Sequence, residues 1–263
     1  KNKVFKVYGT IRSESFLRFF PSNLKENLFT NIDINYLNDL EKLVNDLDPN
    51  LIINCIGIIK QKEKIIKLAD YIYLNSLIPH KLAELAFKVN AKLLHFSTDC
   101  VFSGKKGFYK ETDFADADDI YGRSKFIGEL NYPNTITLRT SIIGHELNSS
   151  LSLIDWFLSQ EHSIKGYNKA IFSGLPTVEI ARIIENYIIP ANDLYGLYHL
   201  SAEPISKYSL LNIVSKIYKK NIIIEKDEEF IVDKSLNSSK FRKETTFFPK
   251  QWDQLIKEMK DFN

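Results

Sequence analysis

Two short runs, LIINCI at Leu51 to Ile56 and KLLHF at Lys92 to Phe96, decide the fold class. The first is continuously apolar apart from Asn54, a pattern typical of a parallel strand that is covered on both faces. Between the two runs, residues 69–89 carry apolar side chains at helical spacing. A strand, a helix and a second strand in this order predict a βαβ unit and a mainly parallel sheet.

The same alternation extends on both sides of this unit. Strand-like runs occur at Val4–Tyr8 and Thr135–Leu138, and helical spacing occurs over 36–47 and about 119–131. Because right-handed crossovers place helices on both faces, we predict a Rossmann-type doubly wound α/β sheet. After residue 145 the rhythm changes, which predicts a smaller α+β lobe. The elements expected after this point are helices at 151–158, 176–189 and 206–219, a strand at 196–200, and a tail that is strand-like at 222–224 and then polar.

Composition excludes several classes of protein. The 263 residues carry 35 Lys and Arg against 33 Asp and Glu, a net charge of +2, and 44% are hydrophobic. These values argue against intrinsic disorder and against a nucleic-acid partner. Two cysteines cannot make a disulfide framework or a four-cysteine zinc site, and the five histidines lack metal-ligand spacing, so we predict no metal. No apolar run approaches 18 residues, which predicts a cytoplasmic protein without a membrane partner.

Two clusters, one on a predicted helix and one after a strand, could carry chemistry. Tyr121 and Lys125 stand four residues apart, so on a helix they share a face, and a nearby ammonium would lower the phenol pKa and suit it to proton transfer. An exposed helix pair is the alternative. Ser97, Thr98 and Asp99 follow the strand ending at Phe96, where hydroxyls could bond a substrate carbonyl or form a helix cap.

A third cluster, Thr10-Ile11-Arg12-Ser13, follows the first strand-like run. In dinucleotide-binding sheets an acidic residue near this point holds the ribose 2′-OH, whereas an arginine suits a 2′-phosphate. Arg12 therefore favours NADP over NAD, although a solvated surface arginine is the alternative. His95 and His199 fall in predicted strands and are expected in the core.

Several segments in order resemble one family. They are Ser97–Phe102 (STDCVF), Tyr121–Glu129 (YGRSKFIGE), Leu138–Ser141 (LRTS) and Ser173–Thr177 (SGLPT). Together they resemble the extended short-chain dehydrogenase/reductase superfamily, and within it the dTDP-4-dehydrorhamnose reductases and related sugar-nucleotide reductases. The resemblance covers essentially the whole chain.

The resemblance implies an NADP-dependent reductase of a nucleotide-linked 4-keto-deoxysugar, acting in surface polysaccharide synthesis. Tyr121 would protonate the forming alkoxide, Lys125 would hold the nicotinamide ribose and lower the Tyr121 pKa, and Thr98 would orient the carbonyl. The implied cofactor-binding residues are Thr10, Arg12, Ser13, Asp33, Ile34, Asn54, Gly57, Asn75 and Lys125. The implied substrate-binding residues are Ser97, Asp99, Phe172, Thr177 and Lys207, with the run Asp233 to Arg242.

The resemblance also implies a division of the chain and a set of alternatives. Residues 1–144 with about 175–200 would form the dinucleotide-binding domain, and 145–174 with 201–263 the sugar-nucleotide lobe; a homodimer is a possible assembly. An epimerase or dehydratase of the same superfamily, or a non-catalytic binding or regulatory subunit, are the alternatives. The run Val232–Leu236 (VDKSL) lacks the Arg-Pro pair common in the family, which suits a relative acting on a UDP-linked amino sugar or another deoxysugar.

The family's Gly-rich turn, GxxGxxG, does not occur in this sequence. That turn and the strand before it would form the first part of the sheet and place the cofactor pyrophosphate on a helix N-terminus. We expect about 20–25 residues carrying this strand and turn to precede Lys1, judged from the length of a βαβ unit. A fragment that lacks them is the alternative.

Overall fold

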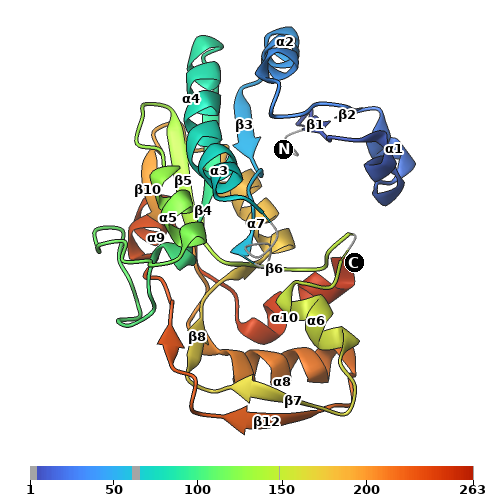
Figure 1. Ribbon diagram of the computed structural model, residues 1–263, viewed down its shortest axis with the longest axis vertical. Helices are drawn as coiled ribbons and strands as arrows, with labels where there is room; N and C mark the ends of the chain where they lie inside the picture. The colour runs from blue at the N-terminus through green and yellow to red at the C-terminus, as the bar shows by residue number, and fades with distance from the viewer. Residues whose placement is uncertain (1–4, 61–65, 148, 263) are drawn as a thin grey trace.

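The computed structural model describes residues 5–60, 66–147 and 149–262, and it is built around a parallel sheet (Figure 1). The sheet has four strands in the order β10-β5-β4-β3, and every neighbouring pair is parallel. In its register Asn54 lies opposite His95, and Thr98 lies opposite Thr140. The strands are β3 (Leu51–Asn54), β4 (Lys92–Thr98), β5 (Thr135–Thr140) and β10 (Gly196–His199).

Helices cover both faces of this sheet. Because side chains alternate along a strand, Leu93 and Leu94 of β4 point to opposite faces. Leu93 packs in one cluster with Leu40 of α2 (Leu37–Leu47) and Leu82 of α4 (Ile78–Lys88). Leu94 packs in a second cluster with residues of α7 (Thr177–Ile183) and α10 (Trp252–Phe262). The prediction of a doubly wound α/β sheet is therefore confirmed.

The predicted helix between β3 and β4 is present but not uniform. It runs as α3 (Leu68–Tyr71), a π-helical segment η3 (Ile72–Leu77) and α4. The helix that carries Tyr121 and Lys125, α5 (Ile120–Ile127), is shorter than predicted. Asp119 caps its first turn, since its carboxylate accepts the Gly122 N–H at 2.7 Å, and Gly128 ends it.

The strand predicted at Val4–Tyr8 is wrong. Val4 lies outside the described residues, and residues 5–8 form no strand. The strand here is β1 (Gly9–Thr10), paired in parallel with β2 (Leu28–Phe29) in a separate two-stranded sheet. Residues 5–8 have no ladder to join, and the Val7 side chain is 70% exposed. Within the described ranges, the edge of β3 that faces away from β4 also has no strand partner.

The C-terminal lobe lies below the sheet in Figure 1. It contains two small sheets, one pairing β7 with β12 and the other ordered β11-β8-β13. Helices α6 (Leu153–Ser159), α8 (Lys207–Tyr218) and α10 complete it. Helix α9 (Ser239–Thr245) lies instead beside β10 of the main sheet, where Phe241 packs on Tyr198 with ring centroids 5.8 Å apart (Figure 1). Its strands are β7 (Ser163–Tyr167), β8 (Ala170–Phe172), β11 (Ile205–Ser206), β12 (Ile223–Asp227) and β13 (Val232–Asp233), while β6 (Ile142–Ile143) and β9 (Leu175–Pro176) pair beside the main sheet.

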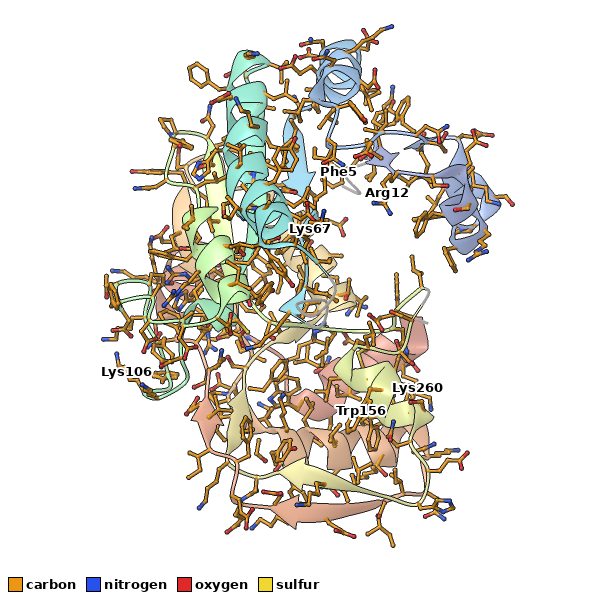
Figure 2. All side chains as sticks on the ribbon, viewed as in Figure 1. Phe5, Arg12, Lys67, Lys106, Trp156 and Lys260 are labelled. Carbon is orange, nitrogen blue, oxygen red and sulfur yellow. The ribbon has the colours of Figure 1, made fainter. Side chains whose placement is uncertain are left out.

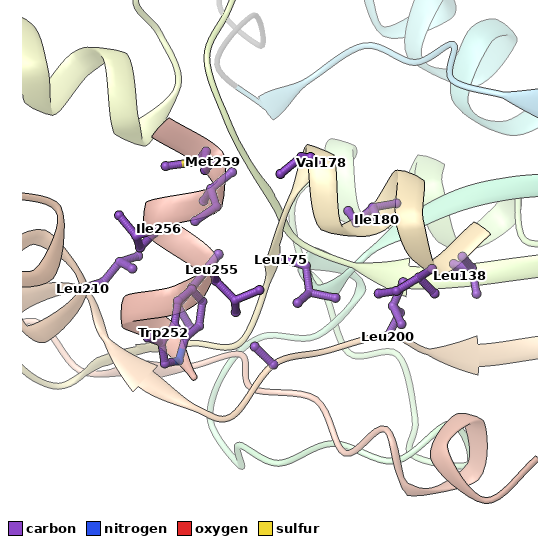
Figure 3. Packing of buried hydrophobic residues seen from close by; sticks show 14 of the residues in the cluster. Leu138, Leu175, Val178, Ile180, Leu200, Leu210, Trp252, Leu255, Ile256 and Met259 are labelled. Atoms are coloured by element: carbon purple, nitrogen blue, oxygen red, sulfur yellow. The ribbon is translucent and has the colours of Figure 1, made fainter. Parts of the chain in front are cut away.

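The expected polar tail is instead helical at α9 and α10. Trp252, Leu255, Ile256 and Met259 follow the i, i+3, i+4, i+7 spacing of a helix with one apolar face, so the signal was in the sequence. Figure 3 shows these four side chains packed toward Leu175 and Leu210. The same cluster contains Leu94 and residues of both regions of the chain, so the sheet and the C-terminal lobe share one core.

Candidate active site

The carboxyl end of β4 brings together the three residues predicted to be catalytic. Thr98 is the last residue of β4, and its hydroxyl accepts the Cys100 N–H at 3.1 Å, capping the short turn η4 (Asp99–Val101). The same hydroxyl donates to the Asp99 carboxylate at 3.2 Å, and Thr98 lies near enough to the Tyr121 phenol to lower its pKa. Tyr121 lies in the first turn of α5, with Lys125 one turn further on. These three side chains therefore converge where ligands bind parallel sheets.

Two glycines hold α5 against its neighbours. A Cβ on Gly122 would overlap the carbonyl oxygen of Cys100, which lies in the turn after β4. A Cβ on Gly128 would overlap the carbonyl oxygen of Asn75 in η3. Only glycine permits backbones to approach so closely, and this contact sets the position of Tyr121 and Lys125.

The Lys125 side chain is buried against β4. Its ammonium donates a hydrogen bond to the Phe96 carbonyl at 2.5 Å. Burial lowers the pKa of Lys125 to about 8, and the nearby Glu129 carboxylate opposes that shift. A Cβ at Gly57 would lie 3.8 Å from the Lys125 Nζ, so the loop after β3 faces the ammonium.

The expectation that Lys125 lowers the Tyr121 pKa is wrong. Burial raises the pKa of Tyr121, the neighbouring Cys100 and Asp99 raise it further, and the Thr98 hydroxyl opposes them. Spacing on a helix face predicts proximity but not the surroundings of each group. Here the ammonium is directed at the Phe96 carbonyl, and desolvation dominates at the phenol.

Asn54, Gly57 and Asn75, all predicted to bind cofactor, lie around the loop after β3. The Asn75 side chain accepts the Ile58 N–H at 2.8 Å and donates to the Ile58 carbonyl at 3.1 Å. It also donates to the Ser124 hydroxyl at 3.1 Å, next to Lys125. Asn75 therefore links the loop to α5, and both its amide oxygen and its amide nitrogen are hydrogen-bonded within the protein.

The remaining predicted cofactor residues form a second group at β1 and β2. Thr10 and Arg12 are exposed. The Ser13 hydroxyl accepts the Ser15 N–H, and the Asp33 carboxylate accepts the Asn35 N–H at 2.9 Å. Ile34 packs against the cluster of α2 and α4. Figure 2 shows Arg12 beside β1, far from Trp156 and Lys260 of the C-terminal lobe.

The predicted substrate residues separate into two sets. Ser97 donates to Glu129 at 2.6 Å, and the buried Phe172 ring packs on Trp252, with ring centroids 5.9 Å apart. Both side chains are thus engaged within the protein, as is Thr177, whose hydroxyl donates to the Ile143 carbonyl.

Asp99 and Lys207, in contrast, lie within electrostatic reach of each other. Burial raises the pKa of Asp99, and the charges of Lys234 and Lys207 oppose that rise. The C-terminal lobe therefore brings two lysines to the carboxyl end of β4. Lys234 was predicted only as part of the run Asp233 to Arg242. Lys60, which was not predicted, pairs with Asp119 at 2.6 Å beside the same site.

Comparison with known proteins shows the family of this chain. The model of the RmlD substrate binding domain matches residues 17–261. The chain belongs to this family. A dTDP-4-dehydrorhamnose reductase of Aggregatibacter actinomycetemcomitans is 30% identical to this RmlD-family chain over 186 residues, 67% of the chain and 63% of the relative. The spore coat polysaccharide biosynthesis protein SpsK of Bacillus subtilis is 27% identical, covering 61% and 58%. The chain thus spans less than two thirds of these curated relatives.

Solved structures share the fold of this RmlD-family chain over nearly its whole length. The dTDP-4-dehydrorhamnose reductase of Bacillus anthracis, solved with NADP, has a TM-score of 0.80 at 18% identity and covers 98% of this chain and 100% of its own. The reductase of Clostridium acetobutylicum has a TM-score of 0.76 at 22% identity, covering 97% and 98%. WbmG of Bordetella bronchiseptica, solved with NAD and UDP, has a TM-score of 0.73 at 16% identity, covering 90% and 80%.

The residues of this RmlD-family chain fit one end of a nicotinamide dinucleotide. Around Lys125, a buried ammonium and a phenol stand beside the loop after β3, a donor set that suits a ribose and a reacting carbonyl. Within the described part of the chain, no group of three or more His, Cys, Asp or Glu side chains could hold a metal ion. No described helix is long and apolar enough to cross a membrane.

Proposed function

We propose that this chain reduces a nucleotide-linked 4-keto-deoxysugar with NADPH. The observation that carries the proposal is the grouping of Thr98, Tyr121 and the buried Lys125 at the carboxyl end of β4, where Lys125 lies one helical turn from Tyr121 and donates to the Phe96 carbonyl. Membership of the RmlD substrate binding domain family and similarity to dTDP-4-dehydrorhamnose reductases support this choice of reaction.

Bound NADPH supplies a hydride to the keto carbon. Tyr121 stays protonated at neutral pH because burial raises its pKa, so it is a proton donor to the oxygen that gains charge. The Thr98 hydroxyl, at the end of β4 and near Tyr121, would hold the same oxygen. Lys125 would hold the nicotinamide ribose from its position beside the Phe96 carbonyl.

The remaining charged residues would bind the phosphate groups of the substrate and of the cofactor. Lys207 and Lys234 supply positive charge beside Asp99, which suits the diphosphate of a sugar nucleotide. Exposed Arg12 at the end of β1 suits the 2′-phosphate of NADP. Asn54, Gly57 and Asn75 would border the cofactor through the loop after β3.

A first prediction concerns Tyr121. With a dTDP-linked 4-keto-6-deoxysugar, Tyr121→Phe is expected to lower kcat by about 10²-fold or more, because the variant lacks the proton donor. The measurement is NADPH oxidation followed by absorbance, repeated with UDP-linked keto sugars. Tyr195→Phe, at a tyrosine that is 65% exposed, is the matched control and should keep the wild-type rate. A Tyr121→Phe enzyme with normal kcat would remove Tyr121 from the reaction.

A further inference from the structure

His95 is a buried titratable residue that the proposed reaction does not use. It lies on β4, directly opposite Asn54 of β3 in the parallel register, and it is fully buried. Its Nδ1 lies 3.1 Å from the Asn54 side-chain nitrogen. Its Nε2 is buried and has no hydrogen-bond partner among the described residues.

The Asn54 amide determines which imidazole nitrogen carries the proton. The Asn54 Oδ1 accepts the Ile56 N–H at 3.0 Å, so its Nδ2 is the group that faces His95. An amide nitrogen only donates, and therefore the His95 Nδ1 accepts and the proton is on Nε2. Burial lowers the pKa of His95 well below its usual range, and the charges of Lys125 and His80 lower it further, so the ring is neutral.

The hydrogen bond from Asn54 to Ile56 fixes the start of the loop after β3. Asn75 fixes the same loop two residues later, through the N–H and carbonyl of Ile58. Gly57 stands between these two anchors and faces Lys125. The next residue along β4 from His95, Phe96, supplies the carbonyl that receives the Lys125 ammonium. His95 is therefore connected to the surroundings of Lys125 in two ways: through Asn54 and the loop after β3, and through Phe96, its neighbour along β4.

We propose that His95 is a positioning residue: as a neutral acceptor at Nδ1 it orients the Asn54 amide and so holds the loop 55–58 against Lys125. The inference rests on the proposed function, since it assigns this loop to cofactor binding. His95 touches neither substrate nor cofactor in this account. Its effect passes through Asn54 and the Ile56 N–H, and a variant that keeps an acceptor at the Nδ1 position should keep that effect.

The test compares His95→Asn with His95→Leu, a pair of nearly equal shape. The Asn carbonyl oxygen can replace Nδ1 as acceptor, and Leu cannot. We expect hydrogen exchange at the Ile56 amide to be roughly fivefold or more faster in the Leu variant than in the Asn variant, the value of one net hydrogen bond. The KM for NADPH should rise by a similar factor in the Leu variant, with a smaller change in kcat, and the Asn variant should recover most of both.

The wild-type protein provides a second measurement that needs no cofactor. The ¹⁵N shifts of the His95 ring should show an unprotonated Nδ1 and a protonated Nε2 from pH 6 to 8. A protonated Nδ1, or equal Ile56 exchange in the Asn and Leu variants, would overturn the role of His95. Loss of the proposed function is a separate result: the wild type would then fail to oxidise NADPH with any keto sugar, while the ring and exchange measurements would still decide the His95–Asn54 link.

Discussion

At the scale of single residues, the unusual group is Lys125. A lysine that is buried and bonded to a backbone carbonyl loses its proton close to pH 8. In the folded protein it therefore binds a proton less tightly than in the unfolded chain. Its charge, which the proposed reaction needs beside the ribose, is present at neutral pH and is lost as the pH rises through about 8.

A prediction about stability follows from that shift. Between the lowered pKa of about 8 and the usual 10.5, the unfolded chain binds more protons at Lys125, so the stability of the folded state rises with pH across this window. Lys125→Met has no such group. The difference in free energy of unfolding between wild type and Lys125→Met, measured by denaturant titration from pH 7 to 10, should move in favour of the wild type. Parallel pH curves for the two proteins would contradict the burial of a titrating ammonium.

The sequence predicted which residues meet at this site but not their ionisation. Helix spacing and a strand end made Tyr121, Lys125 and Thr98 candidates, the family resemblance implied their shared site, and the structure brings them together. The direction of the Tyr121 pKa shift depends on how deeply the phenol is buried and on its neighbours Cys100 and Asp99. Those quantities belong to the packed fold, so no spacing rule could supply them.

At the scale of secondary-structure elements, the position of α5 depends on its two glycines. Gly128→Ala would force a methyl group onto the Asn75 carbonyl and move α5 away from η3. We expect a loss of about 1–3 kcal/mol in the free energy of unfolding, together with a lower kcat because Lys125 moves with the helix. Thermal unfolding and NADPH oxidation measure the two effects.

The matched control for Gly128→Ala lies next to it in the chain. Ile127 is 60% exposed, so Ile127→Ala is expected to change stability by less than about 0.5 kcal/mol. A Gly128→Ala protein as stable and active as this control would show that the close approach of α5 and η3 is not required.

Elements with a clear period were predictable, and elements defined by their neighbours were not. The runs at β3 and β4 and the helix α2 were recognised from apolar pattern alone. The strand-like run at residues 5–8 has the right side chains, yet β2 pairs only with Gly9 and Thr10. A strand exists only where another strand offers its hydrogen bonds, and that information is not local.

At the scale of the whole molecule, one apolar cluster joins the sheet to the C-terminal lobe. Leu255 of α10 is fully buried in it, together with Leu94 and Leu138 of the sheet. Leu255→Ala is therefore expected to lower the free energy of unfolding by about 2–5 kcal/mol, in a single transition for the entire chain. Phe262→Ala on the same helix, at a side chain 76% exposed, should change little. Separate transitions for the sheet and the lobe would contradict a shared core.

The shared core also explains what sequence reasoning missed about the site. Lys234 and Lys207 approach Asp99 because the C-terminal lobe packs on the sheet. Both lysines are more than 100 residues from Asp99 in the sequence, so their position in the sequence does not predict this proximity. Family resemblance pointed to Lys207 and to the run Asp233 to Arg242. Only the packed fold distinguished Lys234 within that run.

The central claim is that hydride passes to the carbon whose oxygen Tyr121 protonates. The most direct measurement uses NADPH deuterated at nicotinamide C4 with a dTDP- or UDP-linked 4-keto-deoxysugar, and reads the product by NMR. The account predicts deuterium at C4 of the sugar and one NADPH oxidised for each sugar reduced, with both lost in Tyr121→Phe. A converted sugar that carries no deuterium, with NADPH unconsumed, would contradict the claim and favour an epimerase or dehydratase.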